Sequence, residues 1–432
     1  MAQEGQAGAR TSNGQRGVPT VSRVEGDTII ELVFDGEKRE TALAVSRFGG
    51  LWNIEREVVI SGETLVPYSP NNNLIRTGCV LLPSKPVHHG DKQELIADIE
   101  AYLAKYLRVS ALFRRIAAHY VLLSWVYDAF NELSYLRLQG DFGTGKTRGL
   151  LTIGSILYKP FFASGASTVS PIFHILETFG GSLILDESDF RFTDHTSELV
   201  KILNNGTTRG LPVLRTIQNQ TKELNPRAFR VFGPKIVAMR GSYDDPGLES
   251  RFISEQMVSR DLPPEIPIHL PTALREDALI LRNRLLHFRF CALFSTKIDA
   301  GLPRGELSPR VGQIALPLLS IIDDSRLRGE VVAMLAKERT QFMENSRDRL
   351  NATVATVLQK LLRRDGAVAV SIGEVTKAVN AESGTMQYTT KHIGNVIRTH
   401  LRLSTRKTDG VFVVERDALP EIDARLLGRV DR

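Results

Sequence analysis

The sequence has few cysteines and no long apolar runs. Only two cysteines occur among 432 residues, and Cys79 and Cys291 lie far apart without the spacing of metal ligands. The low count indicates a reducing compartment and argues against a disulfide framework. Apolar runs are short as well, and none reaches the roughly 18 residues that a membrane-spanning helix needs. We therefore expect a cytoplasmic protein with no membrane partner.

The N-terminal segment lacks large apolar side chains. Residues 1–22 are rich in Gly, Gln, Ser and Arg, and they offer too little apolar surface to offset the entropy lost on ordering. We expect a disordered tail there, without a secretory signal. The whole chain is 42% hydrophobic, which is typical of a globular protein, and its net charge of +6 permits a polyanionic partner.

A glycine-rich loop with the G-x-x-x-x-G-K-[ST] pattern occupies residues 140–147. A short apolar run precedes it and a helical pattern follows, which is the strand–loop–helix context that the pattern requires. The glycines let backbone N–H groups surround a phosphate, and the helix adds its dipole. A chance glycine loop would lack these flanks, so we predict an ATP site. Its predicted nucleotide contacts are Gly140, Gly143, Thr144, Gly145, Lys146 and Thr147.

Two carboxylates follow a second apolar run. Asp186 and Glu187 end the run Leu183–Leu185, and a parallel strand would deliver them beside the phosphate loop. Asp186 and the Thr147 hydroxyl are predicted ligands of Mg²⁺, which prefers few carboxylates plus phosphate oxygens. Lys146 is predicted to reach the β- and γ-phosphates, and Glu187 to act as the base that polarises the attacking water. A plain turn is the alternative for the two acids.

The order of these motifs resembles that of the AAA+ ATPases. A predicted strand that ends at Arg240 follows them, and the run Leu248–Phe252, which contains Arg251, comes next. Further runs at 122–130, 202–210 and 233–235 are similar to uncharacterised AAA+ ATPases of phages, plasmids and integrated elements. Those proteins often accompany primases and are related to superfamily 3 and minichromosome-maintenance helicases.

The resemblance implies a ring, usually a homo-hexamer, in which one subunit's arginine reaches the neighbour's nucleotide. Arg251 is the implied finger. Arg240 stands where the family's sensor 1 usually has Asn or Thr, so it either senses the γ-phosphate or supplies a second cation between subunits. Arg310, at the start of a predicted helix, resembles a sensor 2 arginine, and a solvated arginine is an equal interpretation.

Changes in hydrophobic periodicity divide the chain into four predicted domains after the tail. Short β-like runs with turn dipeptides predict a small β-rich module over 23–88. Residues 89–270 form the α/β core of AAA+ type with its preceding helices. Residues 271–346 form a helical lid, ending in a polar stretch, 344–349, that we expect to separate two helices. Residues 347–432 predict three helices and a β-wing, which make a winged helix-turn-helix.

Two cationic regions are candidate DNA contacts. A polar stretch, 216–226, lies between two predicted strands, and its hairpin or long loop would line a pore around single-stranded DNA. The third helix and wing of the C-terminal domain contain no acid from 391 to 408 and would bind duplex DNA. A solvated basic face or a protein-docking module is the alternative. The candidate residues are Arg215 and Lys222 in the pore and Lys391, Arg398, Arg402, Arg406 and Lys407 in the winged helix.

Two functions compete at this point. The first is an ATP-hydrolysing ring motor that pulls single-stranded DNA through its pore, as a replicative helicase of a mobile genetic element with a primase or replication initiator as partner. The second is an AAA+ switch or loader that remodels a protein partner at a DNA site without unwinding. Cationic pore groups favour the motor.

Overall fold

The computed structural model divides the chain into two compact units. The first comprises Met1–Ser242 and Ser250–Ala333, and the second comprises Tyr243–Glu249 and Met334–Arg432. No helix among the described residues is long and apolar enough to cross a membrane. The structure describes residues 17–47, 49–164, 167–186, 194–218, 224–243, 245–258, 263–299, 301–302, 307–382, 387–408 and 410–427.

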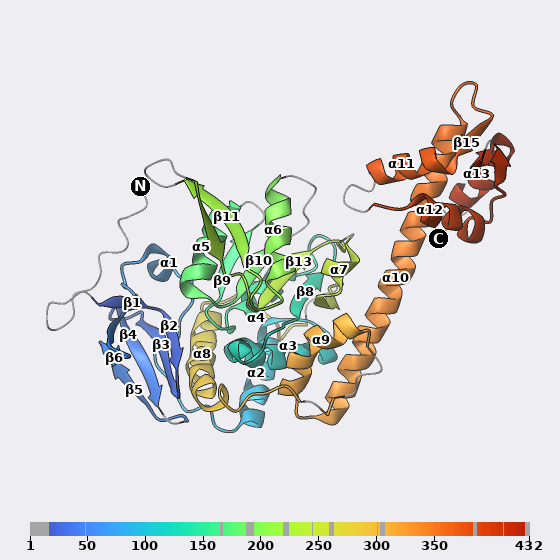
Figure 1. Cartoon of the computed structure of the whole chain (residues 1–432). Helices are drawn as coiled ribbons and strands as arrows, with labels where there is room; N and C mark the ends of the chain where they lie inside the picture. Colours follow the sequence, from blue (N-terminus) through green and yellow to red (C-terminus); the bar gives the residue numbers. More distant parts are fainter. Residues whose placement is uncertain are drawn as a thin grey trace. The chain divides into compact units, whose positions relative to one another are not determined.

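Two small sheets form the β-rich module that the sequence predicts. Regular structure begins at Val18, inside the segment expected to be a tail, because β1 pairs in parallel with β7 and Val21 is buried in the core. The boundary at residue 22 is therefore wrong for residues 18–22. One sheet has the order β2-β3-β4-β5 and the other β1-β7-β6 (Figure 1). Their strands are β1 Val18–Thr20, β2 Ser22–Glu25, β3 Thr28–Asp35, β4 Glu40–Arg47, β5 Trp52–Glu55, β6 Val58–Ile60 and β7 Glu63–Pro67, followed by the short helix α1 Asn73–Arg76.

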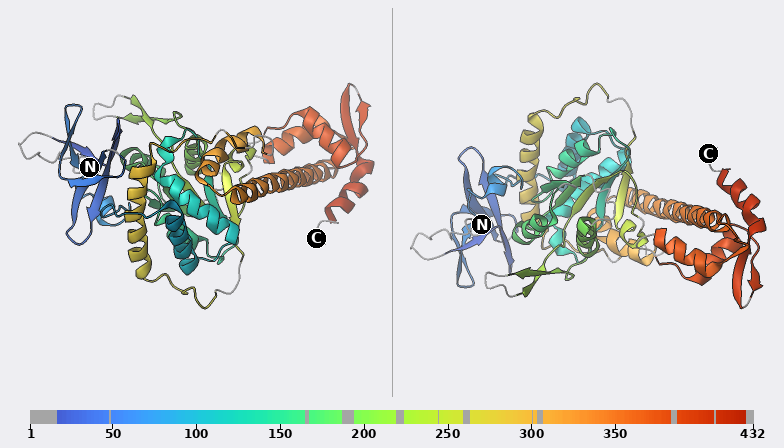
Figure 2. Two further views of the ribbon diagram at one scale, coloured as in Figure 1. Left: turned by 90° about the horizontal axis from the view of Figure 1, so that it is seen from below. Right: turned by 90° about the horizontal axis from the view of Figure 1, so that it is seen from above.

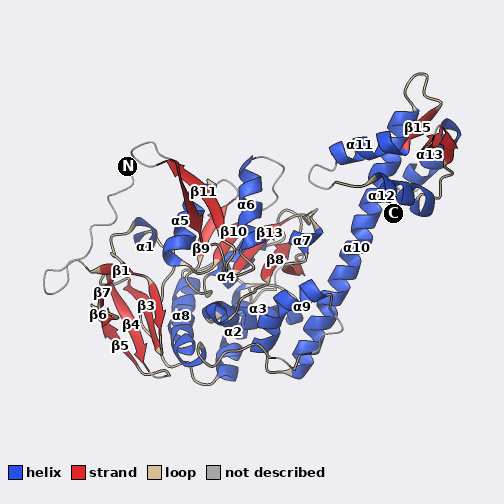
Figure 3. Cartoon of the chain, in the orientation of Figure 1, coloured by secondary structure: helices blue, strands red, loops and turns tan. Residues whose placement is uncertain are grey.

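A sheet of five parallel strands, with the order β14-β8-β13-β10-β9, is the centre of the first unit. Its strands read as short apolar runs because helices cover a parallel sheet on both faces (Figure 3). The carboxyl ends of all five strands meet at one edge. The strands are β8 Tyr135–Gln139, β9 Phe161–Ser164, β10 Leu183–Asp186, β13 Lys235–Met239 and β14 Phe252–Gln256, and the intervening helices of this unit are α4 Lys146–Gly154, α5 Val169–Phe179 and α6 Asp194–Asn205.

An antiparallel hairpin precedes β13. Strands β11 Val213–Gln218 and β12 Leu224–Phe229 pair directly, so the hairpin alternative for this stretch is confirmed. Lys222 lies outside the described residues.

Helix α8, Ala273–Ala292, lies between the β-rich module and two other helices, α2 Lys92–Tyr106 and α3 Ala111–Trp125 (Figures 1 and 2). Helix α2 starts at a capping box in which Asp91 and Glu94 satisfy each other's backbone N–H groups. Helix α9, Pro309–Ile321, follows Ser308 and has proline at its first position, where a missing N–H costs nothing. The one-turn helix η1, Tyr127–Ala129, connects α3 to the sheet.

Helix α10 runs without interruption from Ser325 to Leu362. The separate helices expected on either side of residues 344–349 are therefore wrong. The polar stretch contains neither Gly nor Pro, and its Glu and Arg residues are good helix formers, so nothing in it stops the helix.

The second unit has its own apolar core, which includes Leu358, Val375, Ile393 and Val414. Its strands form one antiparallel sheet with the order β15-β17-β16. Its remaining elements are α7 Pro246–Glu249, β15 Ala369–Ser371, α11 Ile372–Glu382, α12 Thr390–Asn395, η2 Val396–His400, β16 Arg406–Thr408, β17 Val411–Glu415, η3 Arg416–Ala418 and α13 Leu419–Leu427.

Candidate nucleotide site

The glycine-rich loop leaves the carboxyl end of β8 and requires glycine at three positions. Gly143 and Gly145 have φ values of +77° and +88°, in the left-handed region that favours glycine. Gly140 has no room for a side chain, because a Cβ there would lie 2.2 Å from the carbonyl oxygen of Met257. The loop is thus packed against the chain that follows β14. Its tight turn depends on backbone conformations and on a close approach that only glycine allows.

Lys146, the first residue of α4, points back over the loop. Its Nζ donates to the carbonyl oxygens of Gly140 and Asp141, at 2.7 and 2.6 Å. Thr144 donates from its hydroxyl to the same Asp141 oxygen at 2.8 Å. The ammonium group is therefore held at the loop by neutral carbonyl acceptors. Phosphate oxygens are charged and would be stronger acceptors for it.

Thr147 and Asp186 meet beside this loop. The Thr147 hydroxyl donates to Asp186 Oδ2 at 2.7 Å, although β13 separates β8 from β10 in the sheet. Two strand spacings amount to about 10 Å, so the side chain of α4 closes a gap that the strands alone leave open. A hydroxyl and a carboxylate oxygen suit Mg²⁺, so these two residues fit the metal role predicted for them. Glu187 lies outside the described residues.

Arg240 follows β13 and Arg251 precedes β14, the two parallel strands on either side of β8, so they lie at opposite edges of the sheet. Met239 pairs with Gln139, which puts Arg240 level with the start of the phosphate loop. Phe252 pairs with Tyr135, which puts Arg251 at the other end of β8, about 17 Å away along the strand. The Arg251 guanidinium donates to the amide oxygen of Asn204, at the end of α6. Arg251 therefore does not reach a nucleotide bound by its own chain.

Arg310 also lies away from the phosphate loop of its own chain. It is exposed in the first turn of α9, and Gln313, one turn later, donates to Glu132 at 2.9 Å. Glu132 comes just before β8, at the edge of the sheet opposite the loop. This position does not fit the sensor 2 role in the same subunit.

The hairpin places Arg215, one of its two predicted cations, differently from expectation. Arg215 forms an ion pair with Glu198 at 3.3 Å and lies over the ring of Phe173, so its charge is offset within the fold. Sequence reasoning missed Arg227, which pairs with Arg215 in the hairpin register and is exposed. The alternation of the strand could have indicated it, since residues opposite each other in a hairpin share a face.

All five predicted cations of the second unit are exposed. Arg398 lies over the ring of Phe412, and Arg406 forms an ion pair with Glu415 at 3.3 Å. Exposed pairs of this kind contribute little to stability, so they leave the basic character of the face largely intact. The exposed cations are Lys391, Arg398, Arg402, Arg406 and Lys407 on α12, η2, β16 and the chain between them.

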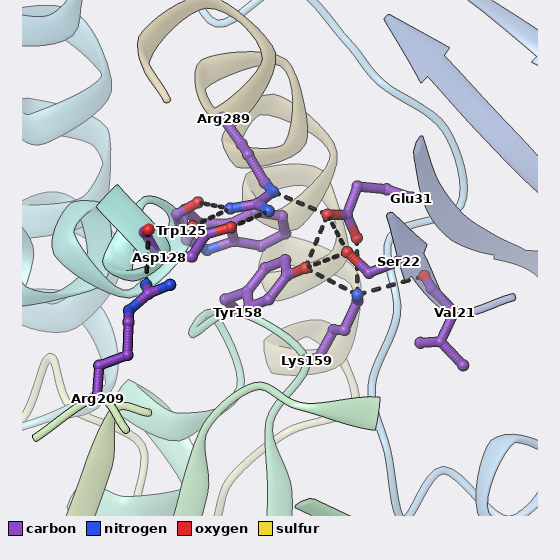
Figure 4. A network of polar contacts seen from close by, with 9 residues as sticks. All are labelled: Val21, Ser22, Glu31, Trp125, Asp128, Tyr158, Lys159, Arg209 and Arg289. Carbon is purple, nitrogen blue, oxygen red and sulfur yellow. Dashed lines mark hydrogen bonds and ion pairs between the residues drawn. The ribbon is translucent and has the colours of Figure 1, made fainter. Parts of the chain in front are cut away.

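A buried ionic network escaped the sequence reasoning (Figure 4). Glu31 on β3 forms an ion pair with Lys159 at 2.7 Å and another with Arg289, a residue of α8, at 2.8 Å. Arg289 also forms an ion pair with Asp128 at 2.7 Å. The Tyr158 hydroxyl donates to Glu31 at 2.7 Å. Burial raises the pKa of Glu31, but the two cations outweigh it and hold the pKa below its usual range. Two carboxylates thus balance two cations, and they join the β-rich module to the core and to α8.

An isolated acid inside an apolar run was the available signal for this network. Glu31 interrupts the run Thr28–Phe34, and its side chain is 1% exposed. A charge in that position needs a partner, but the sequence does not say which residue supplies it.

Comparisons with known proteins find only distant structural similarities. No protein-family model and no curated protein matches the chain. Among solved structures, the apo C-terminal region of NrS-1 is 12% identical, with 89% of this chain and 96% of that chain covered and a TM-score of 0.31. JCV helicase is 14% identical over 59% of this chain and 61% of that one, with a TM-score of 0.23. The Aeropyrum pernix Orc1 protein in complex with DNA is 17% identical over 74% and 93%, with a TM-score of 0.22. The sheet and the loop define this chain as a parallel α/β protein with a phosphate-loop motif.

Proposed function

We propose that this chain is a Mg²⁺-dependent ATPase of the AAA+ type that works in a ring on DNA. The hydrogen bond between Thr147 and Asp186 carries the proposal, because it brings the two predicted metal ligands together beside the phosphate loop. The strand order supports it: β13 lies between the loop strand β8 and the acidic strand β10, so the loop, Arg240 and Asp186 come from three adjacent strands at one edge.

In this proposal the residues at the carboxyl edge of the sheet together carry out ATP hydrolysis. Backbone N–H groups of the loop and Lys146 Nζ bind the β- and γ-phosphates. Thr147 and Asp186 hold Mg²⁺, which would neutralise charge that develops on the phosphate oxygens. Glu187, the next residue after Asp186, takes the proton of the attacking water. Arg240, which follows β13 at the same edge, would either sense the γ-phosphate or supply a second cation between subunits.

The position of Arg251 supports a shared site. A guanidinium at the opposite edge of the sheet is useless to the nucleotide of its own chain, but it can complete the site of an adjacent subunit in a ring. We therefore keep Arg251 as a finger that acts in trans, within a homo-hexamer. Arg310 lies toward the same opposite edge, so it would reach only the nucleotide of a neighbouring subunit, and its sensor 2 role stays a prediction.

DNA is the proposed substrate of the motor. The three helices and the antiparallel sheet of the second unit support a winged helix, whose exposed cations would hold duplex DNA. The hairpin β11–β12, with Lys222 and Arg227, would hold single-stranded DNA. We propose a replicative helicase of a mobile genetic element, with a primase or an initiator as partner.

A loader or switch remains the second candidate, because one observation favours it. The ion pair between Arg215 and Glu198 removes one of the two cations on which the pore was predicted. A hairpin with less positive charge would grip a phosphate backbone less well, and the ATPase would then remodel a protein partner at a DNA site instead.

A strand-displacement assay on forked DNA separates the two candidates. The wild-type chain with Mg²⁺ and ATP should release the displaced strand, whereas Lys146→Ala, which lacks the phosphate cation, should not. If the wild-type chain hydrolyses ATP in the presence of DNA but never displaces a strand, the loader replaces the helicase.

A further inference from the structure

Two histidines and a cysteine from distant parts of the chain converge outside the nucleotide site. His89 precedes α2, and His287 and Cys291 lie on α8. The Nδ1 atoms of the two histidines are 2.7 Å apart, and Cys291 Sγ is 3.8 Å from His287 Nδ1. One ligand atom from each of the three residues lies within 4.8 Å of the others. The His88 ring packs on His287 with centroids 4.4 Å apart.

The spacing on α8 is that of two ligands to one ion. Residues four apart occupy the same face of a helix, so His287 and Cys291 present their side chains in the same direction. Tetrahedral zinc, with bonds of about 2.05 Å to nitrogen and 2.3 Å to sulfur, separates nitrogen from sulfur by about 3.6 Å and two nitrogens by about 3.3 Å. The sulfur already stands close to this separation. The imidazoles need to part by about 0.6 Å, and His89 is only half-buried on a non-helical segment, where a small rotation suffices.

A simple hydrogen bond between the imidazoles explains less of the arrangement. It accounts for the pair of nitrogens but not for the sulfur, which lies 3.8 Å from Nδ1 and 3.9 Å from Nε2 of His287.

We propose that His89, His287 and Cys291 bind Zn²⁺, with His88 or a water molecule as the fourth ligand. Imidazole and thiolate ligands select zinc over Mg²⁺ or Ca²⁺, which take oxygen ligands. The site is distinct from the Thr147–Asp186 pair in both residues and donor chemistry.

Bound zinc would fasten the β-rich module to the core. A Cβ on Gly50, in the loop between β4 and β5, would lie 2.7 Å from Cys291 Sγ, so this loop of the module packs directly on the cluster. Zinc would thus join α8 to the segment before α2, at the point where that loop of the module packs. Arg289, two residues from His287, ties the same helix to β3 through Glu31. Zinc binding would therefore stabilise the joint that the ionic network already spans.

Metal binding to the full-length chain tests the proposal without any use of ATP. The chain is stripped with EDTA, dialysed and titrated with Co²⁺ and then Zn²⁺. We expect one Co²⁺ per chain with a thiolate-to-cobalt charge-transfer band, displaced by Zn²⁺, and a rise in melting temperature with Zn²⁺. Cys291→Ser should abolish the band and weaken zinc binding by more than the 10- to 100-fold that loss of a second-shell partner costs.

Two control variants sharpen the result. Cys79→Ser removes the other thiol and should keep the band, and Asp186→Asn should keep it too, because that residue belongs to the nucleotide site. A band that survives Cys291→Ser, or that is lost with Cys79→Ser, overturns the proposal. So does a wild-type chain that binds Zn²⁺ no more tightly than the His89→Ala variant. We choose His89→Ala because His89 is only half-buried, so the substitution should leave the fold intact. His287 is buried, and replacing it could unfold the chain and obscure the comparison of zinc affinities.

Discussion

Thr147 and Asp186 show what the nucleotide site requires of single residues. They come from α4 and β10, 39 positions apart, and their side chains meet at 2.7 Å. The phosphate loop contributes geometry through its glycines, and Lys146 contributes charge. Each of these residues is specified by a short local pattern, which is why the sequence could predict that Thr147 and Asp186 meet beside the loop; their binding of Mg²⁺ and ATP stays a prediction.

Residues that act through distant contacts are not predictable in the same way. Arg310 matches a family position in order along the chain, yet α9 places it at the edge of the sheet away from the loop. Cys291 has no second cysteine at ligand spacing, and its spacing to His287 does not indicate His89, which only the fold brings beside them. In both cases tertiary packing, and not local pattern, decides the neighbours.

Lys146→Ala should weaken ATP binding, whereas Glu187→Gln should leave binding unchanged and slow hydrolysis. The first removes charge-assisted hydrogen bonds worth about 1.5–3 kcal/mol, or about 10- to 150-fold in Kd. The second removes only the group that activates water. Calorimetric titration with ATP and a turnover assay check both variants. Hydrolysis at the wild-type rate by Glu187→Gln would show that Glu187 is not the base.

At the scale of elements, α8 and β3 depend on charges that neither could bury alone. The network of Glu31, Lys159, Arg289 and Asp128 balances two acids against two cations across the joint between module and core. By contrast, hydrophobic periodicity and turn residues predict most strands and helices of the chain. The hairpin β11–β12 and the start of α9 are two examples. The break expected within α10 fails because a polar surface alone does not end a helix.

Glu31→Gln should destabilise the fold by about 3–5 kcal/mol, because it leaves buried cations with one carboxylate fewer. Glu31→Leu combined with Lys159→Met should cost less than Glu31→Gln, since the pair is removed together. Glu37→Gln, on an exposed turn, is the matched control and should change little. Urea unfolding measures all of these, and equal midpoints for Glu31→Gln and wild type would contradict the assignment.

The same network predicts a dependence on pH. The folded-state pKa of Glu31 lies below the unfolded value of about 4.3, so its contribution is fully present above that pH. As the pH falls through the folded pKa, both states become protonated and the contribution is lost. The difference in unfolding free energy between wild type and Glu31→Gln should therefore be constant near neutral pH and shrink below about pH 4.

The DNA surfaces also belong to separate elements and should separate by mutation. Replacing Arg402, Arg406 and Lys407 with alanine should weaken duplex binding and lower the log–log salt slope by about one unit for each lost phosphate contact. Basal ATP turnover should not change. Lys222→Ala should instead spare duplex binding and reduce both single-strand-stimulated turnover and unwinding. If Lys222→Ala affects neither of these, the hairpin does not grip DNA and the loader is the better account.

At the scale of the whole molecule, the residues of the proposed reaction lie at two edges of the sheet. Lys146, Thr147 and Asp186 meet at the carboxyl edge, and Arg251 lies at the other. In the proposed mechanism, a chain built in this way is incomplete as an isolated subunit. Its proposed activity therefore depends on assembly into a ring. The motif order suggests this assembly only through the family resemblance, and the strand register supports it on physical grounds.

The most direct test of this account is ATP turnover by mixed subunits. Arg251→Ala and Lys146→Ala should each lack activity alone, because an arginine finger is worth about 10³-fold or more in rate and the lysine is needed for binding. Mixed together, they form some interfaces that pair an intact loop with an intact Arg251, so turnover should reappear and peak near equal proportions. No turnover at any ratio, with mixed assembly verified by cross-linking of the two tagged chains, would contradict a site shared between subunits.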